Sequence, residues 1–260
     1  MGKIKGDRKN KNVTFYLGTH EPHWLREIDV PLFVSRRRLD RIKKLPVALC
    51  NWSLDSGGFT ELHQYGGWQL SAKDYASKVK RYVDEIGNLD WAAPQDWMCE
   101  TTAIKSTGLT VEEHQILTVQ NFLELRQLLG TIVVPVLQGW EYDDYHKCVE
   151  MYDKAGVDLS SEPTVGLGSV CRRNALKEIT HIITSLQPLK LHGFGVKGDG
   201  YKANFHKLVS ADSMAWSFGA RYQPPLDGCT HKTCANCKHF ALLWREKMLN
   251  KLKEVRSEES

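Results

Sequence analysis

The sequence has no long hydrophobic run. No apolar stretch among its 260 residues approaches the roughly 18 to 20 residues that a helix needs to span a bilayer. The first residues, Met-Gly-Lys-Ile-Lys, also lack the hydrophobic core of a secretory signal. We therefore expect no membrane partner and a cytoplasmic location.

Internal repeats, low-complexity linkers and a glycine-rich dinucleotide fingerprint after the first strand-like segment are absent too. These absences argue against a repeat protein and a dinucleotide-binding domain. Hydrophobic residues make up 42% of the chain and charged residues 25%, which is ordinary for a globular protein. The length suits one large domain with a full core. We expect a tail over residues 1–12 and a single domain over 13–260.

Cysteine is neither abundant nor evenly spread. The seven cysteines are an odd number, which argues against a disulfide framework in a reducing compartment. Cys229, Cys234 and Cys237, however, lie within eleven residues of one another together with His231 and His239. Thiolate and imidazole are the usual ligands of tetrahedral Zn²⁺, so the segment 229–239 predicts a closed, structural zinc site. We expect the three cysteines and His231 as ligands, with His239 as the substitute for His231.

Positive charge is clustered although the formal net charge is only +4. Five of the first eleven residues are Lys or Arg, and Arg36, Arg37 and Arg38 open a second basic cluster. Such clusters are typical of proteins that bind a phosphate-rich partner. A solubilising tail and a solvated helix face would give the same pattern.

Eight short apolar segments alternate with helical patterns, which favours a (β/α)8 TIM-type barrel over a doubly wound open sheet. The expected strands cover 13–17, 31–34, 47 onward, 89–94, 131–137, 164–168, 190–196 and 211–216. The expected helices cover 35–44, 71–86, 110–129, 143–155, 172–186, 204–209 and 238–253. Thr110 and Glu113 form a capping box at the start of the third helix.

Polar or glycine residues follow five of these strands: Asp55, Asp96, Gln138, Gly168 and Gly195. In a barrel, the carboxyl ends of the strands form the rim that carries chemistry. We therefore expect these residues to surround one site. Asp96 as a helix N-cap and Asp212 as a turn residue are the structural alternatives.

The segment 55–59, Asp-Ser-Gly-Gly-Phe, contains a carboxylate, two residues without a Cβ atom and an aromatic ring. Such a set suits a flat heterocycle that is held by stacking and hydrogen bonds. A tight strand-to-helix turn with a capping Asp55 would explain the same residues. His20 and His23 could line a site or cap a turn, whereas His192 and His206 are expected to have structural roles.

The sequence resembles the tRNA-guanine transglycosylases. Segments 55–59, 138–139, 166–169, 193–197 and 212–221 occur in the order of the signature segments of that family, and the cysteine cluster lies downstream, where the family keeps its zinc. The zinc spacing departs from the family pattern and the chain is short. In both features the chain resembles more closely the DpdA group, which comprises phage and bacterial relatives that place 7-deazaguanines in DNA. For a phage-encoded protein, the expected location would be the host cytoplasm.

The resemblance implies a base exchange: a guanine in DNA is replaced by a free 7-deazaguanine, with 7-cyano-7-deazaguanine as the expected base. It implies Asp212 as the nucleophile that forms a covalent sugar intermediate and Asp55 as the general acid and base. Ser56, Gly57, Gly58, Phe59, Asp96, Gln138, Gly139, Gly168 and Gly195 are implied to bind the base. Arg36, Arg37, Arg38 and Arg221 are implied to contact the nucleic acid.

Three other functions remain open. The chain could modify tRNA, or it could be a non-catalytic, zinc-stabilised partner of an active transglycosylase. It could also be a glycosylase that hydrolyses the bond and leaves abasic sites. A non-catalytic partner would be expected to lack one of the two acids, and this chain has both Asp55 and Asp212.

Overall fold

Eight parallel strands form one curled sheet in the computed structural model, which describes residues 13–170, 176–196 and 198–258. The strand order is β4-β3-β2-β1-β8-β7-β6-β5, and a single parallel bridge between Ala92 and Val133 joins the two sides where the sheet ends. The strands are β1 (Thr14–Thr19), β2 (Leu32–Ser35), β3 (Trp52–Asp55), β4 (Leu89–Ala92), β5 (Val136–Leu137), β6 (Val165–Leu167), β7 (Leu191–Gly193) and β8 (Leu208–Ser213). The expected alternation of strands and helices is therefore confirmed as a curled parallel sheet, with one bridge where a complete barrel would have a ladder.

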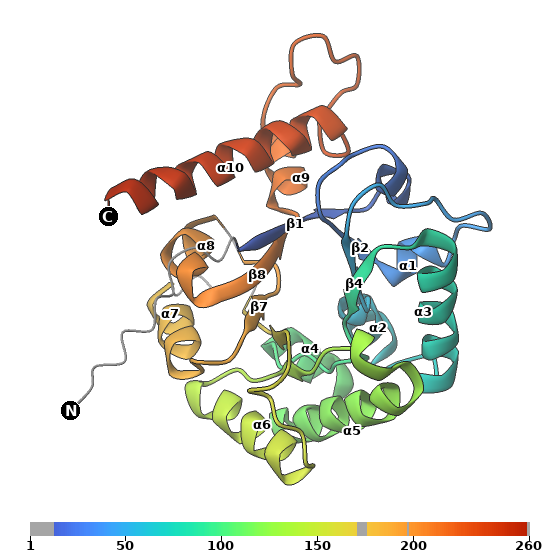
Figure 1. Cartoon of the computed structure of the whole chain (residues 1–260), viewed down its shortest axis with the longest axis vertical. Coiled ribbons are helices and arrows are strands. Elements are labelled where there is room, and N and C mark those ends of the chain that lie inside the picture. Colours follow the sequence, from blue (N-terminus) through green and yellow to red (C-terminus); the bar gives the residue numbers. More distant parts are fainter. Residues whose placement is uncertain (1–12, 171–175, 197, 259–260) are drawn as a thin grey trace.

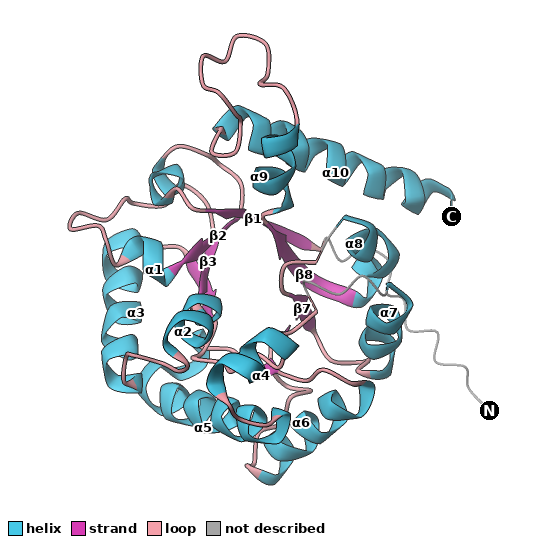
Figure 2. Ribbon diagram, turned by 180° about the vertical axis from the view of Figure 1, so that it is seen from behind, coloured by secondary structure: helices cyan, strands magenta, loops and turns pink. Residues whose placement is uncertain are grey.

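Helices surround the strands, as Figure 1 shows. They are α1 (Arg36–Leu39), α2 (Gly58–Tyr65), α3 (Ala72–Ile86), α4 (Thr101–Thr107), α5 (Val111–Leu129), α6 (Tyr142–Lys154), α7 (Leu176–Ser185), α8 (Gly198–Asn204), α9 (Ala215–Gly219) and α10 (Lys238–Glu258). Short 3-10 turns occupy Pro22–Arg26, Gly130–Ile132, Phe205–Lys207 and Ala220–Tyr222. Figure 2 shows α2 and α4 lying inside the outer circle of α3, α5 and α6.

The two long helices before β5 begin where their sequences provide caps. The Ser71 hydroxyl accepts a hydrogen bond from the Asp74 N–H at 3.1 Å, and the apolar stripe of α3 is buried. The capping box expected for α5 is confirmed, because Thr110 and Glu113 accept hydrogen bonds from each other's backbone N–H groups.

Several expected boundaries were wrong. The strand expected from residue 47 begins at Trp52, since Val47 and Leu49 are 67% and 58% exposed and lie in the approach to the sheet. The strand expected over 131–137 shortens to β5, because a 3-10 turn occupies its first residues. Strand β8 begins within the expected helix 204–209, and the helix at 35–44 is the single turn α1. The start of the helix at 172–186 lies partly outside the described residues.

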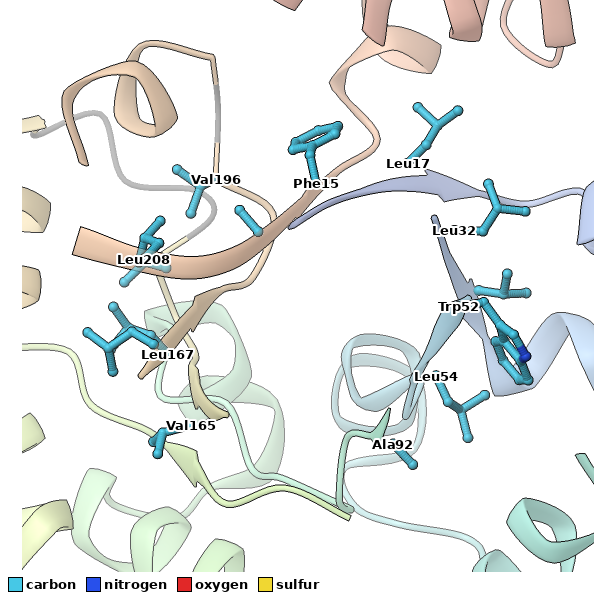
Figure 3. Close-up of a cluster of buried hydrophobic side chains, with 14 of the residues drawn as sticks. Phe15, Leu17, Leu32, Trp52, Leu54, Ala92, Val165, Leu167, Val196 and Leu208 are labelled. Carbon is cyan, nitrogen blue, oxygen red and sulfur yellow. The ribbon is translucent and has the colours of Figure 1, made fainter. Parts of the chain in front are cut away.

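The core has two layers because successive strand residues point to opposite faces of the sheet. Figure 3 shows Leu17, Leu54 and Leu167 pointing away from the space that the strands surround, toward the helices. Inside the curl, a second cluster contains Tyr16, Phe33, Trp91, Ala93 and Val134. These side chains fill the space inside the curled sheet and lie beneath the carboxyl ends of the strands.

The C-terminal helix α10 packs beside the first strand. The rings of Phe15 and Trp244 lie 6.1 Å apart, and Lys238 at the start of the helix pairs with Glu27 at 2.8 Å. Figure 1 shows α10 next to α9 and β1. No helix in the described part of the chain is both long and apolar enough to cross a membrane.

Candidate active site

A cavity of about 340 Å³ opens at the carboxyl ends of the strands. Nine of the expected site residues line it: Asp55, Ser56, Gly58, Phe59, Asp96, Gln138, Gly168, Gly195 and Asp212. They come from the ends of six strands, β3 to β8, or from the segments that follow them. Residues that are up to 157 positions apart in the sequence, from Asp55 to Asp212, therefore meet in one place.

Asp55 is the last residue of β3, and the glycine pair behind it forms the turn into α2. Gly57 adopts a left-handed conformation with φ of 82°, and its N–H donates a hydrogen bond to Asp55 Oδ1 at 3.1 Å. A Cβ atom at Gly57 would lie 2.8 Å from Cγ of Arg37. A side chain is therefore disfavoured here by both backbone and packing, and the turn directs Asp55 toward the cavity.

Asp212 lies in β8 and is buried. The Gly195 N–H donates a hydrogen bond to its Oδ1 atom at 2.8 Å, and Nε2 of His192 lies 3.4 Å from the same oxygen. Both neighbours come from β7 or the turn after it, the adjacent strand of the sheet. The carboxylate is thus held on one oxygen by the neighbouring strand.

The two acids differ in their electrostatic surroundings. Burial raises the pKa of the Asp55 carboxyl, and the negative charge of Asp212 raises it further. The hydrogen bond from Gly57 opposes this shift without cancelling it. Asp55 therefore holds a proton more readily than an ordinary aspartate, which is the property that a proton donor needs at neutral pH.

Asp96 also lines the cavity and forms the centre of a hydrogen-bond network. Ser56 Oγ donates to its Oδ1 at 3.1 Å, and Gln138 Nε2 donates to its Oδ2 at 2.6 Å. Burial raises the pKa of Asp96 to about 6 in spite of these donors. At neutral pH the group is an ionised, fixed acceptor that can also receive the N–H donors of a ligand.

Gln138 is oriented from its other end. The Ser169 hydroxyl donates to Gln138 Oε1 at 2.7 Å and itself accepts the Cys99 N–H at 2.8 Å. A Cβ atom at Gly168 would lie 2.3 Å from Gln138 Nε2, so only glycine leaves room for this amide. Because Oε1 accepts from Ser169, the amide of Gln138 is oriented with its NH₂ group toward Asp96.

Phe59 lies in the first turn of α2, 40% exposed, at the edge of the cavity. Its ring stacks on His63 with 4.0 Å between centroids. Nδ1 of His63 lies 2.8 Å from the Phe59 carbonyl oxygen, and Nε2 lies 2.9 Å from the Thr102 hydroxyl in α4. This contact between α2 and α4 orients the aromatic face.

Gly139, which was also expected to bind the base, has a packing role beside the cavity. A Cβ atom there would lie 2.9 Å from Cβ of Asp144 and 3.0 Å from the Tyr145 nitrogen. Glycine therefore allows the first turn of α6 to lie close behind the end of β5.

The expectation that Arg36 contacts nucleic acid was wrong. Its side chain is buried, its Nε donates to the Ser56 carbonyl at 3.0 Å, and its guanidinium pairs with Asp40 and with Glu61. Arg37, which is half-buried, shares Glu61 at 2.7 Å. A buried carboxylate requires such partners, so Arg36 supports the turn after β3 and is not available to a phosphate.

Arg38 and Arg221 lie near the cavity, although neither lines it. His20 lines the cavity, and burial lowers its pKa, as do the positive charges of Arg38 and Arg221 nearby. Arg221 is exposed, and Arg38 is half-buried without an ion pair to any described residue. His20 thus lies at the site, whereas His23 is exposed and contacts Glu21 at 3.5 Å.

Four residues near the C-terminus could hold a metal ion. The ligand atoms of Cys229, His231, Cys234 and Cys237 all lie within 4.8 Å of one another. Two thiolates bound to one tetrahedral zinc lie about 3.8 Å apart. The Sγ atoms of Cys229 and Cys237 are 4.0 Å apart, and His231 Nε2 lies 3.1 Å from Cys234 Sγ. The donor set fits Zn²⁺, and the group contains His231 rather than His239.

Sequence reasoning missed several cavity residues. Ser35, Met98, Phe194 and Met214 line the cavity, and Ser169 orients Gln138 within it. A signal existed for Ser169, because it directly follows the Gly-Leu-Gly motif of β6 and has a φ of 56°, which is uncommon for a residue with a side chain. Phe194 and Met214 lie in segments 193–197 and 212–221, which carry the family resemblance, whereas Ser35 and Met98 occupy positions without a distinctive local pattern.

The family described as DpdA, DeoxyPurine in DNA protein A, matches residues 11–260, nearly the whole chain. No curated protein matches the chain. DpdA proteins are tRNA-guanine transglycosylase-like, so the resemblance seen in the sequence is confirmed. Membership supports an enzyme of the guanine transglycosylase type that modifies DNA by 7-deazaguanine insertion. The chain belongs to the DpdA family.

Proposed function

We propose that this protein exchanges a guanine of DNA for free 7-cyano-7-deazaguanine through a covalent intermediate between Asp212 and the sugar. The observation that carries the proposal is the pair of acids, Asp55 and Asp212, which line one cavity and interact electrostatically. Replacement of a base with retained configuration requires two successive displacements at C1′, hence one nucleophilic carboxylate and one proton carrier.

The reaction balances with these two groups alone. A carboxylate oxygen of Asp212 attacks C1′, the C1′–N9 bond breaks, and the departing guanine takes its electron pair and the proton of Asp55. The incoming base then gives its N9 proton to the Asp55 carboxylate and attacks C1′, and Asp212 leaves as a carboxylate. One glycosidic bond replaces another, so no oxidant or nucleotide triphosphate is consumed.

Asp96 and Gln138 would bind the edge of the base. An ionised carboxylate can accept from the ring N–H and the exocyclic amine of guanine, and this pair of donors is retained in 7-deazaguanines. Gln138 is already oriented by Ser169 and Asp96, so little reorganisation is needed when the base binds. Phe59, with its face at the cavity edge, would stack on the ring system.

The target guanine must leave the helix to reach the cavity. Arg38 and Arg221 near the cavity would neutralise the phosphates on either side of the extruded nucleotide. Phe218 and Tyr222 flank Arg221 in sequence, are 62% and 75% exposed, and have rings 5.1 Å apart. Exposed aromatic rings beside a cation suit unpaired bases, because every base has a face that can stack.

Zinc would be held by Cys229, His231, Cys234 and Cys237, away from the two acids. With four protein ligands it supplies structural cross-linking and no open coordination position. The Cys237 carbonyl accepts the Ala241 N–H at 3.0 Å, and the Ser217 hydroxyl donates to the Ala235 carbonyl at 2.7 Å. The metal would therefore connect α9 to α10 behind β8, the strand of Asp212.

The test combines a duplex containing labelled guanine, 7-cyano-7-deazaguanine and the purified protein, with mass spectrometry of the released nucleosides. We expect the deazaguanine deoxynucleoside to appear and a protein–DNA band to persist on a denaturing gel. Asp212→Asn should abolish both signals, whereas Asp84→Asn, on the exposed face of α3, should change neither.

Three outcomes would contradict the proposal. Modification of transcribed tRNA but not of DNA would assign the other substrate. Abasic sites in place of modified nucleosides would indicate hydrolysis. Full exchange by Asp212→Asn would exclude the covalent route.

A further inference from the structure

His192 occupies an unusual position inside the curled sheet. Its side chain is fully buried in β7 and is surrounded by aromatic rings, with centroids 4.6 Å away for Trp91, 4.7 Å for Phe194 and 5.7 Å for Phe33. A histidine used only for packing would have both ring nitrogens satisfied by hydrogen bonds. This ring has only one such bond.

The satisfied atom is Nδ1, which lies 2.9 Å from the Ser210 hydroxyl. The other atom, Nε2, is buried and has no hydrogen-bond partner within residues 13–170, 176–196 and 198–258. Its nearest charged neighbour is Asp212 Oδ1 at 3.4 Å, slightly beyond ordinary hydrogen-bond length. The unsatisfied atom therefore lies beside the carboxylate of Asp212, which is the nucleophile in the proposed reaction.

The chemistry of the neighbours selects one tautomer. An ionised carboxylate repels a lone pair and attracts an N–H, so Nε2 carries the proton when it faces Asp212. Nδ1 then has the lone pair, and the Ser210 hydroxyl is its donor. A chain of contacts results in which Ser210 donates to His192 and the protonated Nε2 of His192 lies beside Asp212.

We propose that His192 is a positioning residue for the nucleophile. The Gly195 N–H already bonds Oδ1 of Asp212 at 2.8 Å, and His192 Nε2 lies 3.4 Å from that same oxygen, close enough to bond it after a small shift. Gly195 bonds Oδ1 and His192 Nε2 lies beside it, so Oδ2 is the oxygen left to attack C1′. When the carboxylate leaves in the second displacement, the same donors stabilise the charge that returns to Oδ1. This inference rests on the proposed base exchange.

The experiment compares His192→Phe, His192→Gln and the wild type at saturating DNA and varied free base. Phenylalanine keeps a ring among its aromatic neighbours but has no donor, whereas the glutamine amide can place an N–H near Nε2. We expect His192→Phe to lower kcat about 10- to 100-fold with KM for the base unchanged, because Asp96 and Gln138 bind the base independently. His192→Gln should recover at least about tenfold of a hundredfold loss.

Ser210→Ala provides an independent arm. It should lower kcat by a smaller factor, and its combination with His192→Phe should be no slower than His192→Phe alone, because the hydroxyl acts through the ring. Thermal melting and bound zinc are measured for each variant. If His192→Phe melts at a lower temperature than the wild type, the kcat values of His192→Gln and Ser210→Ala test the positioning role instead.

A kcat of His192→Phe within about twofold of the wild type would overturn the positioning role. So would a His192→Gln variant that melts like the wild type and is as slow as His192→Phe, or a Ser210→Ala loss that adds to that of His192→Phe. Failure of the proposed function is distinguishable, because the wild type would then form no modified DNA in the same assay.

Discussion

Lowering the pH should weaken the binding of free guanine through Asp96. Burial raises the pKa of this carboxyl to about 6, and only the ionised form can accept both donors of the base edge. With that pKa, about one tenth of the protein is competent at about pH 5 and nearly all at about pH 7.5. The dissociation constant of guanine should therefore be about tenfold larger at the lower pH.

Equilibrium dialysis of labelled guanine measures this constant directly, without DNA or turnover. Asp96→Asn should bind about 10- to 100-fold more weakly at about pH 7.5, the loss of a charge-assisted hydrogen bond, and should lose the pH dependence. The pKa of Asp55 is raised as well, so Asp55→Asn is the matched control and should retain the transition. A flat wild-type profile, or a transition that survives in Asp96→Asn and disappears in Asp55→Asn, would refute the assignment.

The raised pKa of Asp96 also makes the free energy of unfolding depend on pH. The sign of this dependence is opposite to that for a salt-bridged aspartate, whose pKa is lowered in the folded state. The native state holds the Asp96 proton up to a pH of about 6, whereas the unfolded chain releases it near its ordinary value of 3.8. The stabilisation by the Asp96 proton is fully present below the pKa of the unfolded chain and is lost as the pH rises through the folded-state pKa of about 6. The difference of about 2 pKa units corresponds to about 3 kcal/mol of unfolding free energy. Denaturant melts of the wild type should show this decline relative to Asp96→Asn.

Three further predictions concern the network, the metal and the two arginines near the cavity. Gly168→Ala should displace the neighbouring glutamine amide and raise KM for the base about tenfold or more, whereas Gly219→Ala, whose nearest neighbour would be 3.8 Å away, should leave steady-state kinetics unchanged. Cys234→Ser should lose bound zinc in elemental analysis and melt at a lower temperature, as should the wild type after chelation. Arg38→Ala and Arg221→Ala should each reduce the slope of DNA affinity against salt by about 1 in fluorescence anisotropy, and unchanged slopes would exclude these phosphate contacts.

The position of the site was predictable because it depends on a local pattern repeated along the chain. Asp55, Asp96, Gln138, Gly168 and Gly195 each follow an apolar segment, and parallel strands bring their carboxyl ends to one edge of a sheet. The cysteine cluster was predictable for the same reason, because all of its ligands lie within a few residues. Only the choice between His231 and His239 as the fourth ligand required the three-dimensional structure.

Contacts between distant residues could not be predicted in this way. Ser169 bonds Cys99, which is 70 positions earlier, and Arg36 pairs with Glu61, which is 25 positions later. A run of three arginines indicates a basic surface, but the pattern cannot show that the first side chain points inward. The identity of the bond partner decides between a structural role and a binding role, and it depends on the complete fold.

The three acids of the cavity differ in their hydrogen-bond donors, and this difference is the physical basis for the separate roles that we propose for them. Asp96 accepts from two side chains and Asp212 from a backbone N–H, while Asp55 accepts mainly from its own turn and lies near the charge of Asp212. Asp55 in turn raises the pKa of Asp96, so these two carboxyl groups titrate as a coupled pair. Removal of the charge at Asp212 would therefore make Asp55 a weaker proton holder. In the proposed exchange, the charge of Asp212 would thus help to keep Asp55 protonated until the departing base requires the proton.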